Sequence, residues 1–386
     1  MNMASTEQFD RTCVKISLDN LKSNYTNICK NVSEGCEVMA VVKANAYGHG
    51  AVKCARALRE AGARSFCVAT VDEAIELRDA GMNDRILILG FIDSNRIDDL
   101  IKYDINPAVY DKTFAKKLSE EAVRQGKTVD IHIKIDTGMS RIGFMADTTS
   151  VEDVVEICNY PGINSYGIFS HFASADTNDD EYTMQQFSKF SNFITALETK
   201  GVKFSMRHIC NSAGIMRFPQ MHLDGVRAGI ILYGYLPQGC PQEEELKEKM
   251  KLRPVMTWLT RVIHVKEVDE GTTVSYGRHF KAPAKTKVAT CAAGYADGLN
   301  RRLSNGFTVR VKEKDVKIIG NICMDMFMID ATELDDIKVG DVVSLVSEEN
   351  DATYMADYLD TINYEITCGV SLRVEKFFFD NGRVIE

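Results

Sequence analysis

Lys43 is placed where a lysine can do covalent chemistry. It follows directly on the apolar run Met-Ala-Val-Val and precedes the segment ANAYGHG. At the end of a buried strand the amine is partly removed from water, which lowers its pKa and suits Schiff-base formation with a carbonyl group. The alternative is that Lys43 has no chemical role, and that its stem packs on apolar surface while its amine stays in water. We therefore take Lys43 as the first candidate for a covalent role.

Further polar residues follow other apolar runs, at the points where predicted strands end. They are Lys134, Asp136, Ser170, His171, Asn211, Ser212 and Arg227, whereas the strand starts carry few comparable groups. In a closed barrel the first and last strands are neighbours, so Lys43 and Arg227 are expected on adjacent strands. The backbone N–H groups of Ala-Gly-Ile after Arg227, with the Ser212 hydroxyl nearby, are suited to hold a phosphate. The pattern predicts a polar site at one end of a barrel.

Eight short apolar runs alternate with helical patterns over most of the first 235 residues. The runs predicted as strands are residues 37–42, 65–70, 85–90, 106–110, 129–136, 164–170, 203–210 and 221–227. Between them, segments such as 51–62, 71–81 and 179–201 repeat apolar residues at the spacing of one helical face. This alternation favours a (β/α)8 barrel, a TIM-like fold whose active site lies at the C-terminal strand ends. An open doubly wound sheet competes, but AYGHG after the first strand lacks the glycine spacing of a dinucleotide-binding turn.

A change in composition near residue 240 indicates a second domain. The acidic stretch QGCPQEEELKEKMK reads as a linker, and the segments after it read as strands separated by Gly, Asn and Asp turns. We therefore predict a barrel domain over residues 12–240, a linker over 241–251 and a mainly β domain over 252–386. Residues 12–18 also read as a strand, which is a candidate to join the β domain in space. Residues 353–360 read as a short helix.

Composition disfavours several classes of function. The chain has 386 residues with 46 Lys and Arg against 55 Asp and Glu, a formal net charge of −9, which disfavours a nucleic-acid partner. No apolar run is long enough for a membrane span, and the polar first residues do not read as a signal peptide. The eleven cysteines are odd in number and form no CxxC pair, which favours reduced thiols in the cytoplasm over disulfides. No metal site is expected.

Nine segments in order give the chain a resemblance to the alanine racemases, pyridoxal-phosphate-dependent enzymes of fold type III. They are AVVKANAYGHG, KIDTGMSRIGF, SHFASAD, CNSAG, VRAGIILYG, VSYGRHF, GYADGLNRRLSNG, GNICMDMFMID and TINYEITCGVS. The resemblance covers nearly the whole chain, and GYADG, CMDMFMID and TINYE favour a racemase over the decarboxylases that share the barrel. It implies the cofactor pyridoxal 5'-phosphate, interconversion of L-alanine and D-alanine for cell-wall peptidoglycan, and a head-to-tail homodimer.

The resemblance also implies two bases on opposite faces of the substrate. Lys43 would hold the cofactor covalently and serve one face, and Tyr276, reaching the cofactor of the other subunit, would serve the other. Racemisation needs two faces because the α-proton leaves one of them and returns to the other. His171 would tune Tyr276, and Arg227 would face the pyridine nitrogen. Since arginine does not give up its proton, the ring stays neutral, and this weaker electron sink disfavours side reactions.

The remaining matching positions are implied to bind cofactor and substrate. For the phosphate they are Tyr47, Ser212, Gly229, Ile230 and Tyr364. For the substrate carboxylate they are Arg141 and Met324, with Lys134 at a position that is often carbamylated. For the access path they are Tyr295, Arg301, Tyr364 and Asp325. The bulk of Tyr276, Tyr364 and Met324 around the α-carbon makes alanine the expected substrate and serine the second.

Departures from the family pattern keep alternatives open. Phe169 stands where some members have tyrosine, and Ala228 stands where proline is common. The first alternative is a racemase of serine, of lysine or of several amino acids. The second is a pyridoxal-phosphate-binding protein without turnover, which would resemble the barrel alone. The third is a decarboxylase of the same fold type, which would need a different acid group opposite the β-domain residues.

Overall fold

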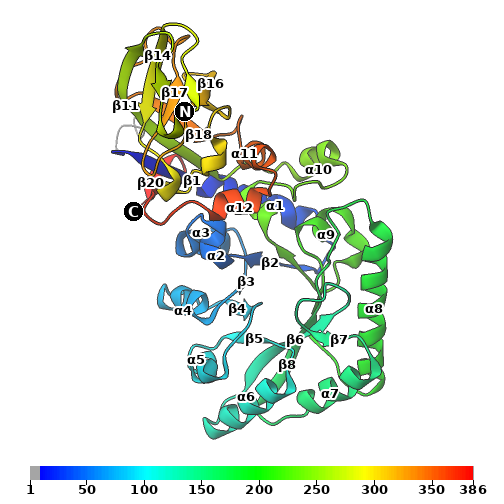
Figure 1. Cartoon of the computed structure of the whole chain (residues 1–386). Coiled ribbons are helices and arrows are strands. Elements are labelled where there is room, and N and C mark those ends of the chain that lie inside the picture. Colours follow the sequence, from blue (N-terminus) through cyan, green and yellow to red (C-terminus); the bar gives the residue numbers. More distant parts are fainter. Residues whose placement is uncertain (1–8, 386) are drawn as a thin grey trace. The chain divides into compact units, whose positions relative to one another are not determined.

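The chain folds into two units, which can be traced by colour in Figure 1. The computed structural model describes residues 9–385. One unit consists of Leu21–Leu252, and the other combines the described residues up to Asn20 with those from Arg253 onward. Each unit is built around its own sheet.

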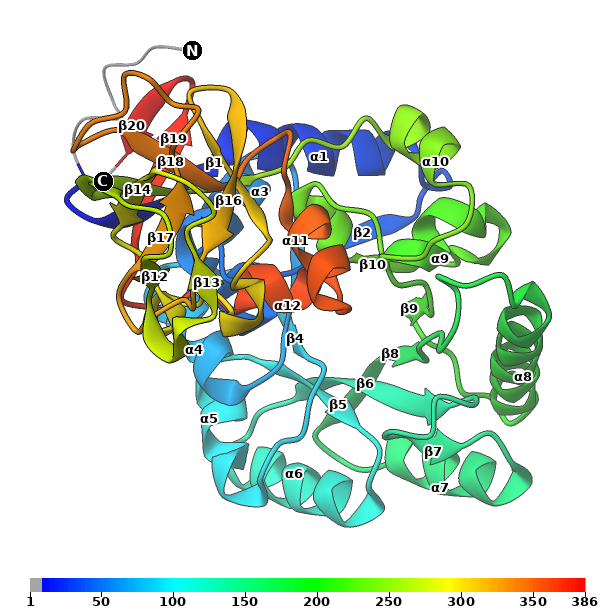
Figure 2. The ribbon, with the colours of Figure 1, turned by 45° about the horizontal axis from the view of Figure 1, so that its top comes forward.

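The unit Leu21–Leu252 is a closed barrel of eight parallel strands, all of them within the described part of the chain. The strands are β2 (Glu37–Val41), β3 (Ser65–Val68), β4 (Arg85–Ile88), β5 (Asn106–Val109), β6 (Val129–Asp136), β8 (Ile163–Phe169), β9 (Met206–His208) and β10 (Gly225–Ala228). Each pairs with the next and β10 pairs with β2, so the ring closes, as can be followed in Figure 2. The predicted barrel is therefore confirmed.

Pairing of the last strand with the first brings the two ends of the barrel sequence together. Arg227 on β10 pairs with Met39 on β2, which confirms that Lys43 and Arg227 belong to adjacent strands. The last strand begins later than predicted, at Gly225 and not at residue 221. Residues Pro219–Met221 form a 3-10 turn and Leu223 has a φ of +54°, so no extended pairing is made before Gly225.

Amphipathic helices lie before the first barrel strand and between the strands that follow it. They are α1 (Leu18–Lys30), α3 (Ala51–Glu60), α4 (Val71–Asp79), α5 (Ile97–Lys102), α6 (Lys112–Arg124), α7 (Thr148–Cys158), α8 (Asp180–Thr199) and α9 (Ser212–Arg217). In α3 the buried residues include Ala51, Cys54, Ala55 and Leu58, the spacing of a single helical face. The stretch interpreted as a linker contains a further helix, α10 (Glu243–Met250), whose Leu246 and Met250 are buried.

The second unit is built on a nine-stranded sheet within its described residues. Its order is β14-β17-β16-β15-β18-β11-β1-β19-β20. The strands are β1 (Thr12–Ser17), β11 (Met256–Val268), β14 (Thr286–Cys291), β15 (Thr308–Val311), β16 (Lys314–Ile319), β17 (Phe327–Asp330), β18 (Val342–Val346), β19 (Glu375–Asp380) and β20 (Arg383–Ile385). The long strand β11 pairs antiparallel with β1, β14 and β18, which makes it the centre of the unit. The predicted mainly β fold of this region is confirmed.

Short elements complete the second unit. The hairpin of β12 (Thr273–Val274) and β13 (Phe280–Lys281) and the helices α11 (Ala352–Leu359) and α12 (Asn363–Cys368) connect its strands. Across residues 9–385, no helix combines the length and the apolar character needed to span a membrane. Within the same residues, no group of three or more His, Cys, Asp or Glu side chains is arranged to hold a metal ion.

Candidate active site

Lys43 stands at the start of a left-handed turn at the C-terminal end of β2. The strand ends at Val41, and Lys43 begins the turn α2 (Lys43–Tyr47), in which the four residues after the lysine have φ between +52° and +54°. For L-residues this conformation costs about 1–2 kcal/mol each, or about 4–8 kcal/mol for the turn. Lys43 itself is half-buried. Such strain persists only where surrounding contacts impose it, and it is common at functional sites.

Hydrogen bonds in the following loop hold this turn. The Ala46 N–H donates to the Val42 carbonyl at 2.8 Å, and the Gly48 N–H donates to the Ala44 carbonyl at 3.0 Å. The Asn45 side chain accepts from the Ala51 N–H at 2.8 Å, which ties the turn to the start of α3. The backbone around Lys43 is therefore held by bonds in the following loop and by one bond that spans the lysine, from Ala46 to Val42.

Three groups from separate segments meet at Gly229, directly after β10. The Gly229 N–H donates to the Ser212 hydroxyl at 3.1 Å. A Cβ atom at position 229 would lie 2.8 Å from the Tyr47 hydroxyl and 3.4 Å from Ser212 Oγ, so glycine is needed for this close approach. The next residue begins the 3-10 turn Ile230–Tyr233, and the first N–H groups of such a turn have no acceptor within it. Two hydroxyls and adjacent backbone N–H groups suit an anion such as phosphate.

The guanidinium of Arg227 is buried and held by four acceptors. Its Nη1 donates to His208 Nδ1 at 2.6 Å. Its Nη2 donates to the carbonyls of Ser170 at 2.7 Å and Ile209 at 2.9 Å, and to His171 Nδ1 at 3.1 Å. Burial lowers the pKa of Arg227 to about 10, so the group keeps its charge near neutral pH. The geometry allows Arg227 to present hydrogen-bond donors but not to act as an acid.

The contact with Arg227 fixes the protonation state of His171. Arginine only donates, so Nδ1 of His171 is unprotonated and the neutral ring carries its proton on Nε2. Removal from water and the positive charges of Arg227, Arg141 and Lys134 hold the pKa of His171 well below its usual range. His171 therefore offers an Nε2–H donor without a positive charge of its own.

Two histidines that the sequence analysis did not single out extend this network. His208 ends β9, and its Nε2 lies 3.0 Å from His132 Nδ1 on β6. Because Nδ1 of His208 accepts from Arg227, its proton is on Nε2 and it donates to His132. Gly167 makes room for this contact, since a Cβ there would lie 2.2 Å from His132 Nδ1. His132 is two positions before Lys134, so the two side chains lie on the same face of the strand. This alternation could have identified His132 as a site residue from the sequence.

Lys134 is buried among these cationic groups. Its Nζ donates to the Ile135 carbonyl at 2.7 Å and lies 5.5 Å from the centre of the Phe169 ring. Burial and the charges of Arg227 and Arg141 lower the pKa of Lys134 to about 7. A large share of this lysine is therefore neutral, and nucleophilic, at neutral pH. Arg141 itself is exposed on the loop that follows β6.

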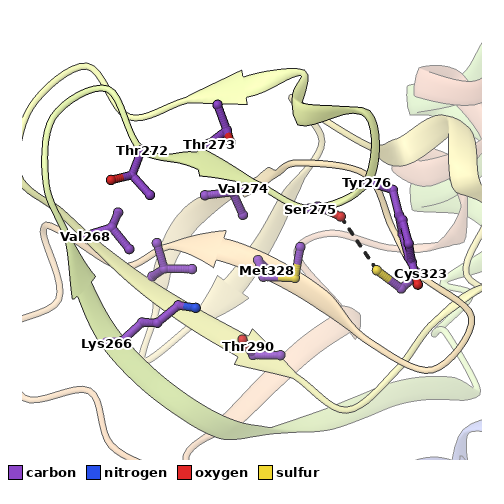
Figure 3. A pocket seen from close by; sticks show the side chains of 11 residues that line it. Lys266, Val268, Thr272, Thr273, Val274, Ser275, Tyr276, Thr290, Cys323 and Met328 are labelled. Atoms are coloured by element: carbon purple, nitrogen blue, oxygen red, sulfur yellow. Dashed lines mark hydrogen bonds between the residues drawn. The ribbon is translucent and has the colours of Figure 1, made fainter.

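The other unit carries six of the predicted site residues. They are Tyr276, Tyr295, Arg301, Met324, Asp325 and Tyr364. Tyr276 begins the 3-10 turn Tyr276–Arg278, and its carbonyl accepts from Asn321 Nδ2 at 2.7 Å. Its ring is 73% exposed and borders a pocket of about 460 Å³, with Lys266 at the opposite end (Figure 3). The backbone of Tyr276 is thus fixed while its phenol is accessible.

The other five residues of this set lie on short segments. Tyr295 is on the 3-10 turn Tyr295–Asp297, Arg301 begins the turn Arg301–Leu303, and Tyr364 is on α12. Met324 is exposed on the loop between β16 and β17, and Tyr364 is half-buried. The structure therefore brings the barrel residues together in one unit and the remaining six in the other.

A buried carboxylate organises the segment around Asp325. Asp297 accepts from Arg11 Nη1 at 2.9 Å and Nη2 at 2.8 Å, from Arg373 Nε at 2.7 Å and from the Gly294 N–H at 2.8 Å. Arg373 Nη2 also donates to Asp325 at 2.6 Å. Asp297 therefore positions Asp325 through a shared arginine.

Replacing Asp297 by alanine is expected to lower the free energy of unfolding by about 1.5–3 kcal/mol, because Arg11, Arg373 and the Gly294 N–H lose a shared charged acceptor. Urea unfolding of the wild-type chain and of Asp297→Ala measures this loss. The matched control is Asp325→Ala, which removes the exposed partner of Arg373 and is expected to cost less than about 1 kcal/mol. Equal costs for the two variants would contradict the central role of Asp297.

Comparisons with known proteins match both units. The family model of the alanine racemase N-terminal domain matches residues 16–237, and that of the alanine racemase C-terminal domain matches residues 255–378. A curated alanine racemase of Clostridium perfringens (strain SM101 / Type A) is 46% identical over 376 residues, which cover 96% of each chain. The solved alanine racemase of Clostridium difficile 630 has a TM-score of 0.94 at 38% identity, with 98% of each chain covered. A solved alanine racemase of Bartonella henselae with covalently bound pyridoxal phosphate has a TM-score of 0.85 at 29% identity, covering 96% of this chain and 100% of the other.

Proposed function

The chain belongs to the alanine racemase family, and on that premise we propose that it interconverts L-alanine and D-alanine with pyridoxal 5'-phosphate as its cofactor. The observation that carries the proposal is the arrangement at the C-terminal end of the barrel. Lys43, the Gly229 cradle with Ser212 and Tyr47, and the buried Arg227 belong to neighbouring strands and their following turns. The covalently bound pyridoxal phosphate of the Bartonella henselae relative supports the choice of cofactor.

The residues present fit this cofactor. Its phosphate is an anion, and the cradle at Gly229 offers two hydroxyls and a backbone approach that a Cβ atom would block. Ile230 and Tyr364 complete the proposed phosphate site. When bound, the cofactor supplies an aromatic ring that withdraws the electron pair left after removal of the substrate α-proton. Lys43 is the amine that holds it covalently.

Lys43 and Tyr276 are the proposed bases on opposite faces of the substrate. Tyrosine, with an ordinary pKa near 10, needs its anion stabilised before it can accept a proton at neutral pH. His171 supports this role because its neutral ring carries an Nε2–H donor while Nδ1 is held by the cationic Arg227. The stabilising charge in this proposal resides on Arg227, and His171 transmits it as a hydrogen bond.

Arg227 is proposed to face the pyridine nitrogen of the cofactor. Its hydrogen bonds to His208, Ser170, Ile209 and His171 use Nη2 and one hydrogen of Nη1. Nε–H, which these contacts do not use, is the donor that would face that nitrogen. Since arginine keeps its proton, the ring nitrogen would stay unprotonated, which disfavours transamination and elimination.

Substrate size and assembly follow from the residues of the second unit. Arg141 and Met324 are proposed to receive the substrate carboxylate, and Tyr295, Arg301 and Asp325 to line the access path. If Tyr276, Tyr364 and Met324 face the α-carbon, as proposed, their bulk restricts the substrate side chain to about the size of a methyl group. The exposed phenol of Tyr276 supports a head-to-tail homodimer in which it reaches the site of the other copy.

The biological setting is also part of the proposal. D-alanine made by this reaction would enter cell-wall peptidoglycan. All eleven cysteines are free thiols in the structure, which supports a reducing compartment, the cytoplasm.

Chiral chromatography tests the proposed reaction. The purified chain with pyridoxal phosphate is offered L-alanine, L-serine, L-lysine and L-ornithine in separate reactions. D-enantiomer is expected from alanine, with little or none from the others. If D-serine or D-lysine formed as fast as D-alanine, the assignment of alanine as the substrate would be wrong. Release of carbon dioxide would indicate a decarboxylase.

Carbamylation of Lys134 is expected to increase with pH. The neutral amine attacks carbon dioxide, the new N–C bond forms and one proton is released, which leaves a carbamate anion beside Arg141. With a pKa of about 7, roughly a tenth of Lys134 is neutral at pH 6 and roughly nine tenths at pH 8. The carbon-13 signal of a carbamate formed from labelled bicarbonate should therefore be several-fold stronger at pH 8. Lys134→Met should remove it, and a signal that persists in this variant would refute the assignment.

A further inference from the structure

We propose that Glu73 is a positioning residue, which fixes the backbone that carries Lys43. The inference deepens the proposed function and rests on it, because it takes Lys43 as the residue that holds the cofactor. Glu73 is on helix α4, thirty residues further along the chain, and sequence analysis gave it no role.

The carboxylate of Glu73 joins the ends of two neighbouring barrel strands. Its Oε1 accepts from the N–H of Ala44, the residue directly after Lys43, at 2.7 Å. Its Oε2 accepts from the N–H of Ala69 at 2.7 Å and from that of Thr70 at 3.3 Å, just after β3. Strands β2 and β3 are paired in the barrel, so one side chain clamps the segments that follow both.

The clamp acts at the first residue of the left-handed turn. Ala44 is the first of four residues with positive φ, and its N–H belongs to the same peptide group as the Lys43 carbonyl. The bonds of Asn45 and Gly48 hold the turn from its C-terminal side, and the Ala46 N–H reaches back across Lys43 to the Val42 carbonyl. The bond from Ala44 to Glu73 holds the turn where it meets Lys43. Without it, the strained turn can relax and shift the Lys43 amine.

The chemistry of this contact requires a carboxylate. Two oxygens, both acceptors, face N–H donors on opposite sides, and hydrogen bonds to a charged acceptor are the stronger kind. Glutamine presents one oxygen and one NH2 group, so in either orientation one backbone N–H meets another donor. Aspartate is shorter by one methylene group. A glutamine substitution, although nearly isosteric, should therefore lose the clamp.

The competing interpretation is that Glu73 only caps helix α4. Thr70 and Glu73 form a reciprocal capping box, in which Thr70 Oγ1 accepts from the Glu73 N–H at 3.2 Å. Thr70→Ala removes the other half of this box and leaves the contact between Glu73 and Ala44 in place. It is therefore a matched control for loss of the helix cap.

The experiment compares Glu73→Ala, Glu73→Gln and Thr70→Ala with the wild-type chain. Pyridoxal phosphate is added to each apo-protein, and its attachment is followed by absorbance, then trapped with borohydride and located by peptide mass spectrometry. Both Glu73 variants are expected to attach the cofactor at least tenfold more slowly and to lose about 10²-fold in kcat, the effect of a misplaced reacting group. The KM for alanine should change less than about threefold, because the proposed carboxylate-binding residues are untouched. Thr70→Ala should show a lowered Tm with attachment and kcat within about twofold of wild type.

Two results would overturn the inference. One is wild-type attachment kinetics and kcat in Glu73→Gln, and the other is an equal loss in Thr70→Ala and Glu73→Ala. If Glu73→Ala does not fold, Glu73→Gln carries the test, because it alters only the acceptor pattern. Failure of the wild-type chain to trap the cofactor on Lys43 would instead refute the proposed function, and the inference with it.

Discussion

Lys43→Ala is expected to fold normally and to lose both the absorbance of the covalently bound cofactor and more than about 10⁴-fold of the racemase rate. The lysine is half-buried and outside the run of positive φ values, so alanine fits its backbone. Lys134, the other lysine assigned to the site, lies on β6 and its Nζ is bonded to the Ile135 carbonyl, so we expect it to react with carbon dioxide in its own place and not to take over from Lys43. Absorbance spectra of the purified variant with pyridoxal phosphate, and the initial rate of D-alanine formation, measure the two losses.

The control for this prediction is Lys116→Ala, which removes an exposed lysine of helix α6. Its spectrum and rate should equal those of the wild-type chain. If Lys43→Ala retained the absorbance of a covalently bound cofactor after dialysis, another lysine would be the anchor. The roles assigned to the left-handed turn and to Glu73 would then be lost as well.

Tyr276→Phe is expected to keep the cofactor and to lose α-proton exchange unequally between the two enantiomers. Phenylalanine preserves the ring and removes only the hydroxyl that is proposed as the base. In the proposed mechanism, Tyr276 serves the L face and Lys43 the D face. Exchange of L-alanine should therefore fall by about 10²–10⁴-fold, the usual contribution of a general base, and exchange of D-alanine should fall less. Proton NMR in deuterated water measures both rates on one sample.

Tyr358→Phe is the matched control, since it removes a phenol hydroxyl from an exposed tyrosine of the same unit, on α11. Both exchange rates should stay at the wild-type value in this variant. Equal residual exchange of L-alanine and D-alanine in Tyr276→Phe would refute the assignment of separate bases to the two faces.

Much of the barrel could be predicted because its strands are apolar runs bounded by turn residues. Strand β6 occupies the predicted residues 129–136, and β11 lies within residues 252–386, which were predicted to be mainly β. The predicted start of β10 was wrong because Met221 and Leu223 are apolar but not extended. Met221 lies in a 3-10 turn and Leu223 has a left-handed backbone conformation. Helix α10 was interpreted as a linker because of its charge, although Glu243 and Lys247 form an ion pair at helical spacing.

Other features of the site could not be predicted because tertiary contacts impose them. Alanine, asparagine and tyrosine give little reason for four consecutive left-handed residues after Lys43, and the turn depends on bonds to Glu73 and Ala51. The partnership of Arg227 with His208 joins residues on two different strands. The expectation of few polar strand starts was also too simple, since β2, β3 and β4 begin with Glu37, Ser65 and Arg85.

The most direct test of the central claim is α-proton exchange by the wild-type chain. The purified protein with pyridoxal phosphate is incubated in deuterated water with L-alanine or with D-alanine, and proton NMR and chiral chromatography follow each reaction. Both enantiomers are expected to lose their α-proton, and both reactions are expected to reach the same equal mixture of L-alanine and D-alanine. Bound cofactor without exchange of either enantiomer would contradict it and indicate a binding protein without turnover.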